Sequence, residues 1–180
     1  MLSDLIHRRL IADKANLETV KQSPTNPLFT EYTDRYSLAY HIFSLLMGGC
    51  SPFAGMIDID ELAQHRSKTI SDIDVDELKA AQRGEFLFSK KFAMRRIPEY
   101  APKYKILSSQ LQKLFERAFV DGASDPSDRP DETEFYYALE EYRNTLHKKI
   151  GCREGHYMPS KYVGPCEWCR INKVKEQLSK

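Results

Sequence analysis

The sequence lacks an excess of charge of either sign. Its 27 Lys and Arg residues are balanced by 26 Asp and Glu residues, which leaves a formal net charge of +1. A strongly basic chain attracts nucleic acid or an anionic membrane over its whole surface, and this chain has no such general field. Any nucleic-acid partner must therefore be recognised locally, by a small basic segment.

Long hydrophobic runs are also missing. The N-terminal sequence MLSDLIHRRLIADK carries charges within every short apolar stretch. No run approaches the roughly eighteen residues that a membrane-spanning helix needs. We therefore expect a cytoplasmic protein without a membrane partner. The 180 residues are enough for one substantial core with appendages.

Motifs for catalysis are scarce as well. The sequence has no glycine-rich loop that would hold phosphates, no HExxH metal motif, and no Ser, His and Asp in a hydrolase order. Acidic residues at 58–61 and 140–141 fit solvated surfaces better than a catalytic pair. An independent enzyme is thus the least supported class of function.

Hydrophobic periodicity predicts a mainly α-helical fold. Apolar residues recur at helical intervals in four segments: 2–22, 34–47, 108–120 and 130–151. A short helix is expected at 76–84, closed by Gly84. No strand with alternating polarity is predicted before residue 150.

The connecting segments have different characters. Segment 57–77 is acidic and polar, and we expect a solvated, partly irregular excursion there. Segment 85–107 predicts a long packed loop held by Phe86, Phe88 and Tyr104. Segment 121–130 is rich in turn-forming residues.

The segment TDRYSLAYHIFSLLMGG at 33–49 predicts an unusual helix. Thr33 suits the N-cap, Asp34 places a negative charge in the first turn, and Gly48 and Gly49 end the helix. Apolar side chains point in every direction around it. We therefore expect a central core helix that other elements surround on all sides.

Two segments resemble the C-terminal lobe of eukaryotic-type protein kinases. DRYSLAYHIFSLLMGGCSPFAG at 34–55 is similar to the kinase segment written D-x-W-S-x-G, followed by an apolar helix and Pro-Phe. LQKLFERAFVDGASDPSDRPDETEFYYAL at 111–139 is similar to the closing kinase segment, in which Arg-Pro precedes the last helix. The resemblance covers roughly residues 28–169 and implies a protein-kinase-like C-lobe helical fragment.

The resemblance also implies roles for two residues. Asp34 matches the kinase aspartate that accepts hydrogen bonds from the catalytic-loop backbone, and Arg129 matches the arginine that pairs with the APE glutamate. Both are implied to be structural posts. Their usual partners are absent, so we expect backbone amides of the first turn or the N-terminal helix around Asp34. Glu31 or another acid should pair with Arg129, because an unpaired buried charge costs several kcal/mol.

The catalytic half of a kinase has no counterpart in this sequence. GxGxxG, VAIK, DFG and APE motifs are all absent, and those parts hold ATP and magnesium. HRRL at 7–10 echoes the HRDL catalytic loop, but Arg9 replaces the aspartate base. The resemblance therefore implies a pseudokinase, or a truncated or split kinase, that binds neither ATP nor Mg²⁺ alone. Its expected partner is another protein, such as a missing N-terminal half.

Three of the four cysteines lie near the C-terminus, together with a histidine. Cys152, His156, Cys166 and Cys169 follow the spacing C-x3-H-x9-C-x2-C. A CxxC turn presents two thiolates, and the upstream pair can complete the tetrahedron that Zn²⁺ accepts. Four protein ligands leave no open coordination position. We therefore expect a structural zinc that staples the C-terminal segment to the last helix.

Two alternatives to this zinc site stay open. His147 or His41 could take the place of His156, and Cys166 and Cys169 could be free thiols or a redox pair. The fourth cysteine, Cys50, is isolated after two glycines and has no neighbouring base. It fits a small buried hydrophobic residue better than a nucleophile.

The C-terminal sequence also carries a resemblance of its own. CREGHYMPSKYVGPCEWC at 152–169 is similar to the ending of bacterial protein kinases with a CPWC-like Cys/His cluster, some joined to helix-hairpin-helix DNA-binding segments. The expected organisation is an N-terminal helix and linker (1–27), a C-lobe-like domain (28–150) and a zinc-knuckle-like extension with a basic tail (151–180). In an alternative function, Arg170, Lys173 and Lys175 of this tail contact nucleic acid.

Overall fold

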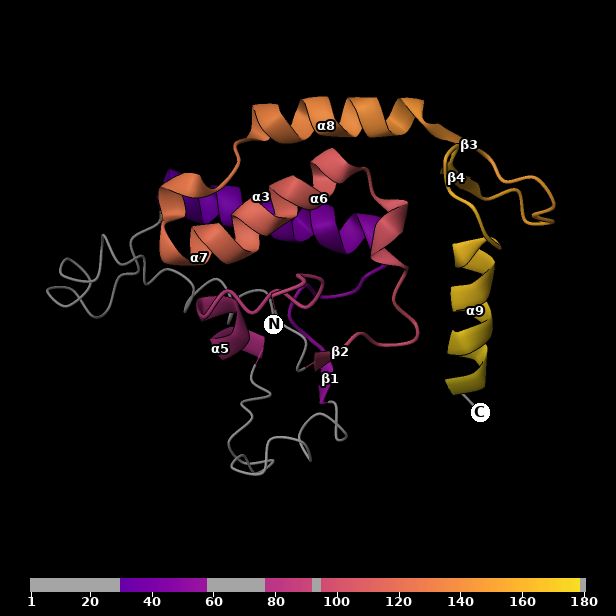
Figure 1. Cartoon of the computed structure of the whole chain (residues 1–180), viewed down its shortest axis with the longest axis horizontal. Coiled ribbons are helices and arrows are strands. Elements are labelled where there is room, and N and C mark those ends of the chain that lie inside the picture. Colours follow the sequence, from indigo (N-terminus) through magenta and orange to yellow (C-terminus); the bar gives the residue numbers. More distant parts are fainter. Residues whose placement is uncertain (1–29, 58–76, 92–94, 179–180) are drawn as a thin grey trace, which may run out of the picture.

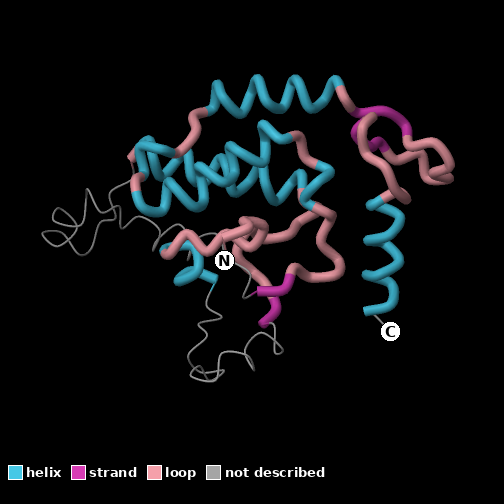
Figure 2. The backbone as a smooth tube through the Cα atoms, viewed as in Figure 1, coloured by secondary structure: helices cyan, strands magenta, loops and turns pink. Residues whose placement is uncertain are grey.

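The structure is a computed structural model that describes residues 30–57, 77–91 and 95–178. The described part is mostly helical, with two small antiparallel strand pairs (Figures 1 and 2). The predicted helix over 2–22 and most of the predicted excursion over 57–77 lie outside it. None of the described helices is both long and apolar enough to cross a bilayer.

The α-helices, in chain order, are α3 (Glu31–Leu46), α5 (Glu77–Gln82), α6 (Ser109–Glu116), α7 (Gly122–Ser124), α8 (Glu132–Asn144) and α9 (Glu167–Leu178). A π-helical turn at Arg117–Asp121 joins α6 to α7, and 3-10 turns lie at Tyr104–Ile106 and Pro126–Asp128. Strand β1 (Met56–Ile57) pairs with β2 (Arg95–Arg96), and β3 (Leu146–Lys148) pairs with β4 (Tyr157–Pro159).

Helix α3 has the predicted end but a different start. Its N-cap is Thr30, and Thr33, the predicted cap, lies inside the first turn, where its hydroxyl accepts a 3.3 Å hydrogen bond from the Thr30 amide. The helix ends where Gly48 and Gly49 adopt positive φ, and the Gly49 amide returns to the Ser44 carbonyl at 2.8 Å. Glycine adopts this left-handed turn without a Cβ clash, so the predicted stop is confirmed.

The prediction that other elements surround α3 on all sides is wrong. One stripe of the helix is buried: Thr33, Tyr36, Ala39, Phe43 and Met47. Apolar neighbours such as Leu38 and Ile42 are only partly buried, and Leu45 is 82% exposed. An apolar sequence shows that a helix is able to be buried, but the neighbours that pack against it decide which sides are covered.

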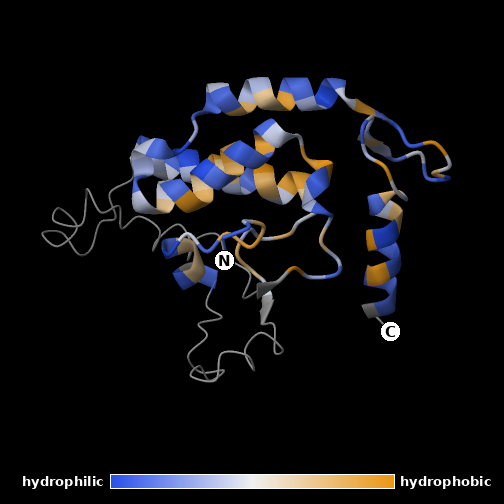
Figure 3. Ribbon diagram, in the orientation of Figure 1, coloured by the Kyte–Doolittle hydropathy of each residue, from blue (hydrophilic) through white to orange (hydrophobic). Residues whose placement is uncertain are grey.

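Aromatic side chains form the core beside α3. The ring of Phe43 lies 5.5 Å from that of Phe86, 5.1 Å from that of Phe115 and 5.9 Å from that of Phe119. These three contacts are edge-to-face, the geometry that the ring quadrupole favours. The ribbon of α6 passes over that of α3, and α8 runs alongside them (Figure 1). Apolar residues of α3 and α6 stand out in Figure 3. The core therefore joins segments that are far apart in the sequence.

The segments between the first helices agree with prediction where they are described. Helix α5 stops before Gly84, which has a φ of +68°. The following loop is anchored by the buried rings of Phe86 and Phe88, with Tyr104 packed against the core. The predicted short helix, its glycine stop and the packed loop are confirmed.

The helices after residue 107 differ from prediction at their ends. Ser108 caps α6 as predicted by accepting from the Leu111 amide at 3.2 Å, but the helical turns continue to Ser124. Helix α8 begins after Asp131, which caps it together with Glu134. The prediction therefore placed the start of this helix slightly too early, at Pro130.

The prediction that helix continues to about residue 151 is wrong. Helix α8 ends at Asn144 and β3 begins at Leu146. The prediction of no strand before residue 150 is wrong here and at the short strands β1 and β2. The chain leaves the helix because the backbone from 145 onward pairs with the segment around 157–160; the Ser160 amide, for example, donates to the Thr145 carbonyl at 2.8 Å. Pairing across such a hairpin is a tertiary interaction that helical periodicity cannot indicate.

Candidate metal centre

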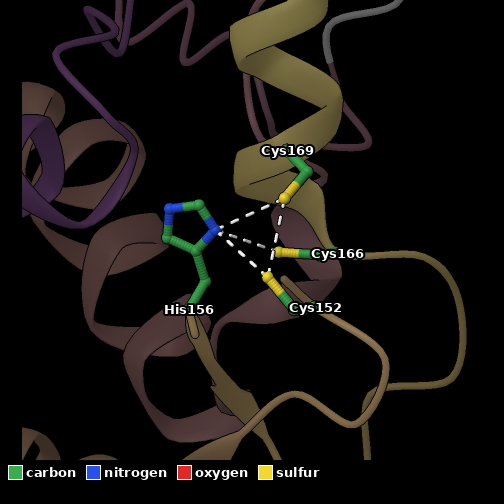
Figure 4. A group of neighbouring side chains, drawn as sticks. All are labelled: Cys152, His156, Cys166 and Cys169. Carbon is green, nitrogen blue, oxygen red and sulfur yellow. Dashed lines mark hydrogen bonds between the residues drawn. The ribbon is translucent and has the colours of Figure 1, made fainter. Parts of the chain in front are cut away.

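Four side chains of the C-terminal region converge from two elements. The loop between β3 and β4 carries Cys152 and His156, and the N-terminal turn of α9 carries Cys166 and Cys169. Their ligand atoms all lie within 4.8 Å of one another. Figure 4 shows the Nδ1 atom of His156 facing the three sulfurs. The structure thus brings together the four residues that the spacing predicted.

The distances fit a tetrahedral zinc site. The Nδ1 atom of His156 lies 3.4 Å from the sulfur of Cys152 and 3.5 Å from those of Cys166 and Cys169. The sulfurs of Cys152 and Cys169 are 3.6 Å apart. Bond lengths of about 2.3 Å to sulfur and about 2.0 Å to nitrogen give tetrahedral edges of about 3.8 Å between sulfurs and about 3.6 Å between sulfur and nitrogen. The donor set can therefore hold Zn²⁺ with little movement.

The four cysteines form no disulfide with one another. All four are free, and the sulfurs of Cys152 and Cys169 lie 3.6 Å apart, beyond the disulfide bond length of about 2.05 Å. The thiols interact strongly instead. The backbone N–H of His156 lowers the pKa of Cys152 to about 6, whereas the hydrogen bond with Cys152 raises the pKa of Cys169 to about 12. The first thiolate forms easily, but its negative charge opposes the formation of a second thiolate beside it. A bound divalent cation would remove this repulsion.

The other candidate residues lie elsewhere. His147, in β3, is exposed, and its Nδ1 lies 3.0 Å from the Thr145 carbonyl. His41 is exposed on α3, beside the ring of Tyr40. Cys50 is buried, and burial raises the pKa of its thiol, as expected for a small core residue rather than a nucleophile. His156 is therefore the histidine that completes this site.

A buried carboxylate within the CxxC turn was not predicted. Glu167 is fully buried. Tyr162 donates a hydrogen bond to it, Lys103 pairs with it at 3.2 Å, and Arg170 pairs with it at 2.8 Å. Burial opposes the charged form, but these three partners outweigh it and lower the pKa of Glu167. Glu167 thus connects the cluster to residues of the packed loop.

The tryptophan of the same turn faces the helical core. A Cβ atom on Gly48 would lie 3.4 Å from the Trp168 ring, an ordinary van der Waals distance, so the ring sits beside the end of α3. The Trp168 Nε1–H donates to the Tyr157 carbonyl at 3.3 Å. Both residues between the CxxC cysteines therefore fasten the cluster to its surroundings. The signal that could have indicated this was the single tryptophan of the sequence, placed between two ligands.

The basic residues proposed as nucleic-acid contacts have different surroundings. Arg170 donates to the Glu99 and Ala101 carbonyls, both at 2.7 Å, in addition to its pairing with Glu167. Lys173 is exposed on α9 and lines a hollow beside the cluster. The charge of Lys175 acts on Cys50, and this lysine does not line the hollow. Arg170 and Lys173 therefore both line the hollow, but Arg170 is engaged by Glu167 and two carbonyls whereas Lys173 is exposed.

The two residues matched to kinase posts also differ from each other. Asp34 is exposed in the first turn of α3, and threonines make the capping contacts there. Arg129 is buried; it donates to the Gly122 carbonyl at 3.0 Å and to the Tyr32 carbonyl at 2.9 Å, and it lies 5.2 Å from the Tyr36 ring centroid.

Glu31, the acid named as an expected partner of Arg129, pairs elsewhere. It lies 3.8 Å from Arg35, and Arg129 donates to two backbone carbonyls. The Arg129 side chain packs tightly against Gly122, because a Cβ atom on this glycine would come within 2.5 Å of the Arg129 Cγ. Arg129 therefore ties the segment before α8 to α3 and α7.

Comparison of the chain with protein-family models, with curated proteins and with solved structures found no match.

Proposed function

We propose that this chain is a zinc-stapled helical interaction module, built like the C-terminal lobe of a protein kinase and without the parts that bind ATP. The closed metal centre carries the proposal. Four protein ligands fill the tetrahedron, so the ion has no open position for water or substrate and serves structure rather than catalysis.

The kinase-like part of the proposal draws support from the packing of α3. This helix buries its stripe against α6 and the turns before α8, and Arg129 links the loop before the last helix of the lobe to the start of α3. The sequence lacks the glycine-rich loop, the strand lysine and the DFG motif. Such a chain would act by binding, with another protein, such as a kinase N-terminal half, as its partner.

Metal analysis of the purified chain tests the closed centre. We expect one zinc per chain, and loss of most of it in Cys166→Ser, because a hydroxyl is a poor replacement for a thiolate ligand. Cys50→Ser is the matched control and should keep its zinc. A zinc content far below one in the unaltered chain, or equal contents in the two variants, would remove the staple.

Titration of the zinc-loaded chain with ATP and magnesium tests the absence of a kinase site. We expect no heat of binding, because no phosphate-holding loop is present in the sequence. Clear saturable binding of ATP would reject an inactive interaction module while leaving the metal centre in place.

A further inference from the structure

We propose that the hollow beside the metal centre binds the phosphate backbone of a nucleic acid. The hollow has a volume of about 670 Å³ and lies between the β3–β4 loop and α9. Cations from both elements line it: Lys149 and Arg153 from the loop, and Arg170 and Lys173 from the helix. This proposal goes beyond the interaction with a protein partner.

The four cations form two pairs with different roles. Lys149 donates to the Tyr162 carbonyl at 3.3 Å, and Arg170 is held by Glu167 and two backbone carbonyls. These two add positive charge but are fixed in place. Arg153 and Lys173 are exposed, and neither side chain makes an ion pair or hydrogen bond within the described part of the chain. They can therefore reach an external anion.

The charge of the whole chain is divided unevenly along its length. Residues 145–180 contain eight Lys or Arg and only three Asp or Glu, whereas residues 1–144 contain nineteen and twenty-three. One of the three acids, Glu167, is already paired with Lys103 and Arg170. The near-zero net charge thus conceals a basic C-terminal region attached to an acidic remainder, which would repel a polyanion and leave the basic end as its binding surface.

Two negative groups also border the hollow and weaken its attraction for an anion. Glu154 lines it, and zinc held by three thiolates carries a net charge of −1. The cations still outnumber these groups. The site is also too large for one phosphate, and its reachable cations come from two different elements. A strand with successive phosphates fits this arrangement better than a single small anion.

An exposed apolar side chain adds a second kind of contact. Ile150 lines the hollow and is 97% exposed. It lies in the same loop, between Lys149 and Arg153 in the sequence, so an apolar contact to a sugar or base could accompany the phosphate contacts. A site for a free inorganic anion would have no use for such a residue.

Fluorescence anisotropy with short labelled DNA, single-stranded and duplex, tests the proposal on the zinc-loaded chain. We expect salt-dependent binding of at least one form. Charge reversal in Arg153→Glu/Lys173→Glu should weaken it by about tenfold or more and reduce the slope of log affinity against log salt by about 2. The matched control is Lys90→Glu/Lys113→Glu, which makes the same change in net charge on two exposed lysines that do not line the hollow. The control should bind at most slightly more weakly than the unaltered chain.

Each of three results would overturn the proposal: no binding of either DNA form at low salt, equal weakening in the two double variants, or preferential binding to phosphatidylserine vesicles over DNA. Zinc content measured on every variant ensures that a lost staple is not mistaken for a lost phosphate contact. Failure of this test would leave the closed metal centre and the ATP result untouched, because neither depends on Arg153 or Lys173.

Discussion

A carboxylate without exposure to solvent is unusual in a CxxC turn. Removing an ion from water costs several kcal/mol, so a buried acid is tolerated only when charged or hydrogen-bonding partners surround it. Glu167 has three such partners, Tyr162, Lys103 and Arg170, and they come from outside the turn. Its charge therefore links the metal centre to the packed loop, a role that no pattern in the sequence predicted.

The variant Glu167→Gln tests this role at neutral pH. The amide keeps the size of the side chain but loses its charge, so Lys103 and Arg170 lose their counter-ion. We expect the free energy of unfolding to fall by about 2 kcal/mol, measured by urea denaturation of zinc-loaded protein. Glu154→Gln on the exposed loop is the control and should change it by less than about 0.5 kcal/mol. Equal effects would show that Glu167 contributes no more than a surface acid.

The same pair of proteins has a defined pH dependence. The folded-state pKa of Glu167 is lowered, so its stabilising contribution is fully present above the unfolded-state pKa of about 4.3. The contribution is lost as pH falls through the lower folded-state value, where the carboxylate becomes protonated. We expect the stability difference between the unaltered chain and Glu167→Gln to be constant from pH 6 to 8 and to shrink below about pH 4. A difference that grows on acidification would contradict this assignment.

Helix α3 shows how far an apolar sequence can mislead about burial. Its sequence is apolar on every side, yet Phe43 is fully buried and Leu45 is 82% exposed. The ends of the helix were easier to predict than its surroundings. The glycine stop follows from local backbone sterics, whereas the covered face follows from which distant segments pack against it.

Two alanine variants of α3 measure this difference between its faces. Phe43→Ala should lower the free energy of unfolding by about 3–5 kcal/mol, because it leaves a cavity among the rings of Phe86, Phe115 and Phe119. Leu45→Ala should change it by less than about 0.5 kcal/mol. Urea denaturation compares the two, and Phe43→Leu provides a milder change if the alanine variant does not fold. Equal costs would mean that both faces of α3 are covered.

The helix after Arg129 illustrates the opposite case, in which the type of element was right and its end was wrong. Periodicity correctly identified Phe135, Ala138 and Tyr142 as its buried face. It also assigned Leu146 to the same helix, but that residue begins β3. A leucine is compatible with both structures, and only the partner strand at Tyr157–Pro159 decides between them.

At the scale of the whole molecule, the described residues form one buried cluster, which the metal centre adjoins. Met158 and Tyr162 of the C-terminal region belong to the same buried cluster as Phe43 and Phe115. Trp168 packs against that cluster as well. Zinc would therefore stabilise a region that is already attached to the helices by apolar contacts, by Glu167 and by Arg170.

Removal of the metal should consequently affect the molecule unevenly. With zinc at about a thousand times its dissociation constant, binding stabilises the folded chain by about 4 kcal/mol. We expect a strong chelator to lower the melting temperature and to increase amide hydrogen exchange in β3, β4 and α9 far more than in α3 and α6. Cys166→Ser should show no further response to the chelator. Unchanged exchange in α9 of the zinc-depleted chain would contradict a stapling role.

Local rules in the sequence determined the helical class, the glycine stops and the three cysteine ligands of the metal centre. Backbone sterics and the reach of a CxxC turn act over a few residues, so they can be recognised without the fold. Tertiary structure alone decided that His156 rather than His147 or His41 completes the centre, and that Arg170 is engaged while Lys173 is presented to solvent. It also decided which face of α3 is buried. These outcomes depend on which distant segments meet, because burial and charge pairing are properties of neighbours in space.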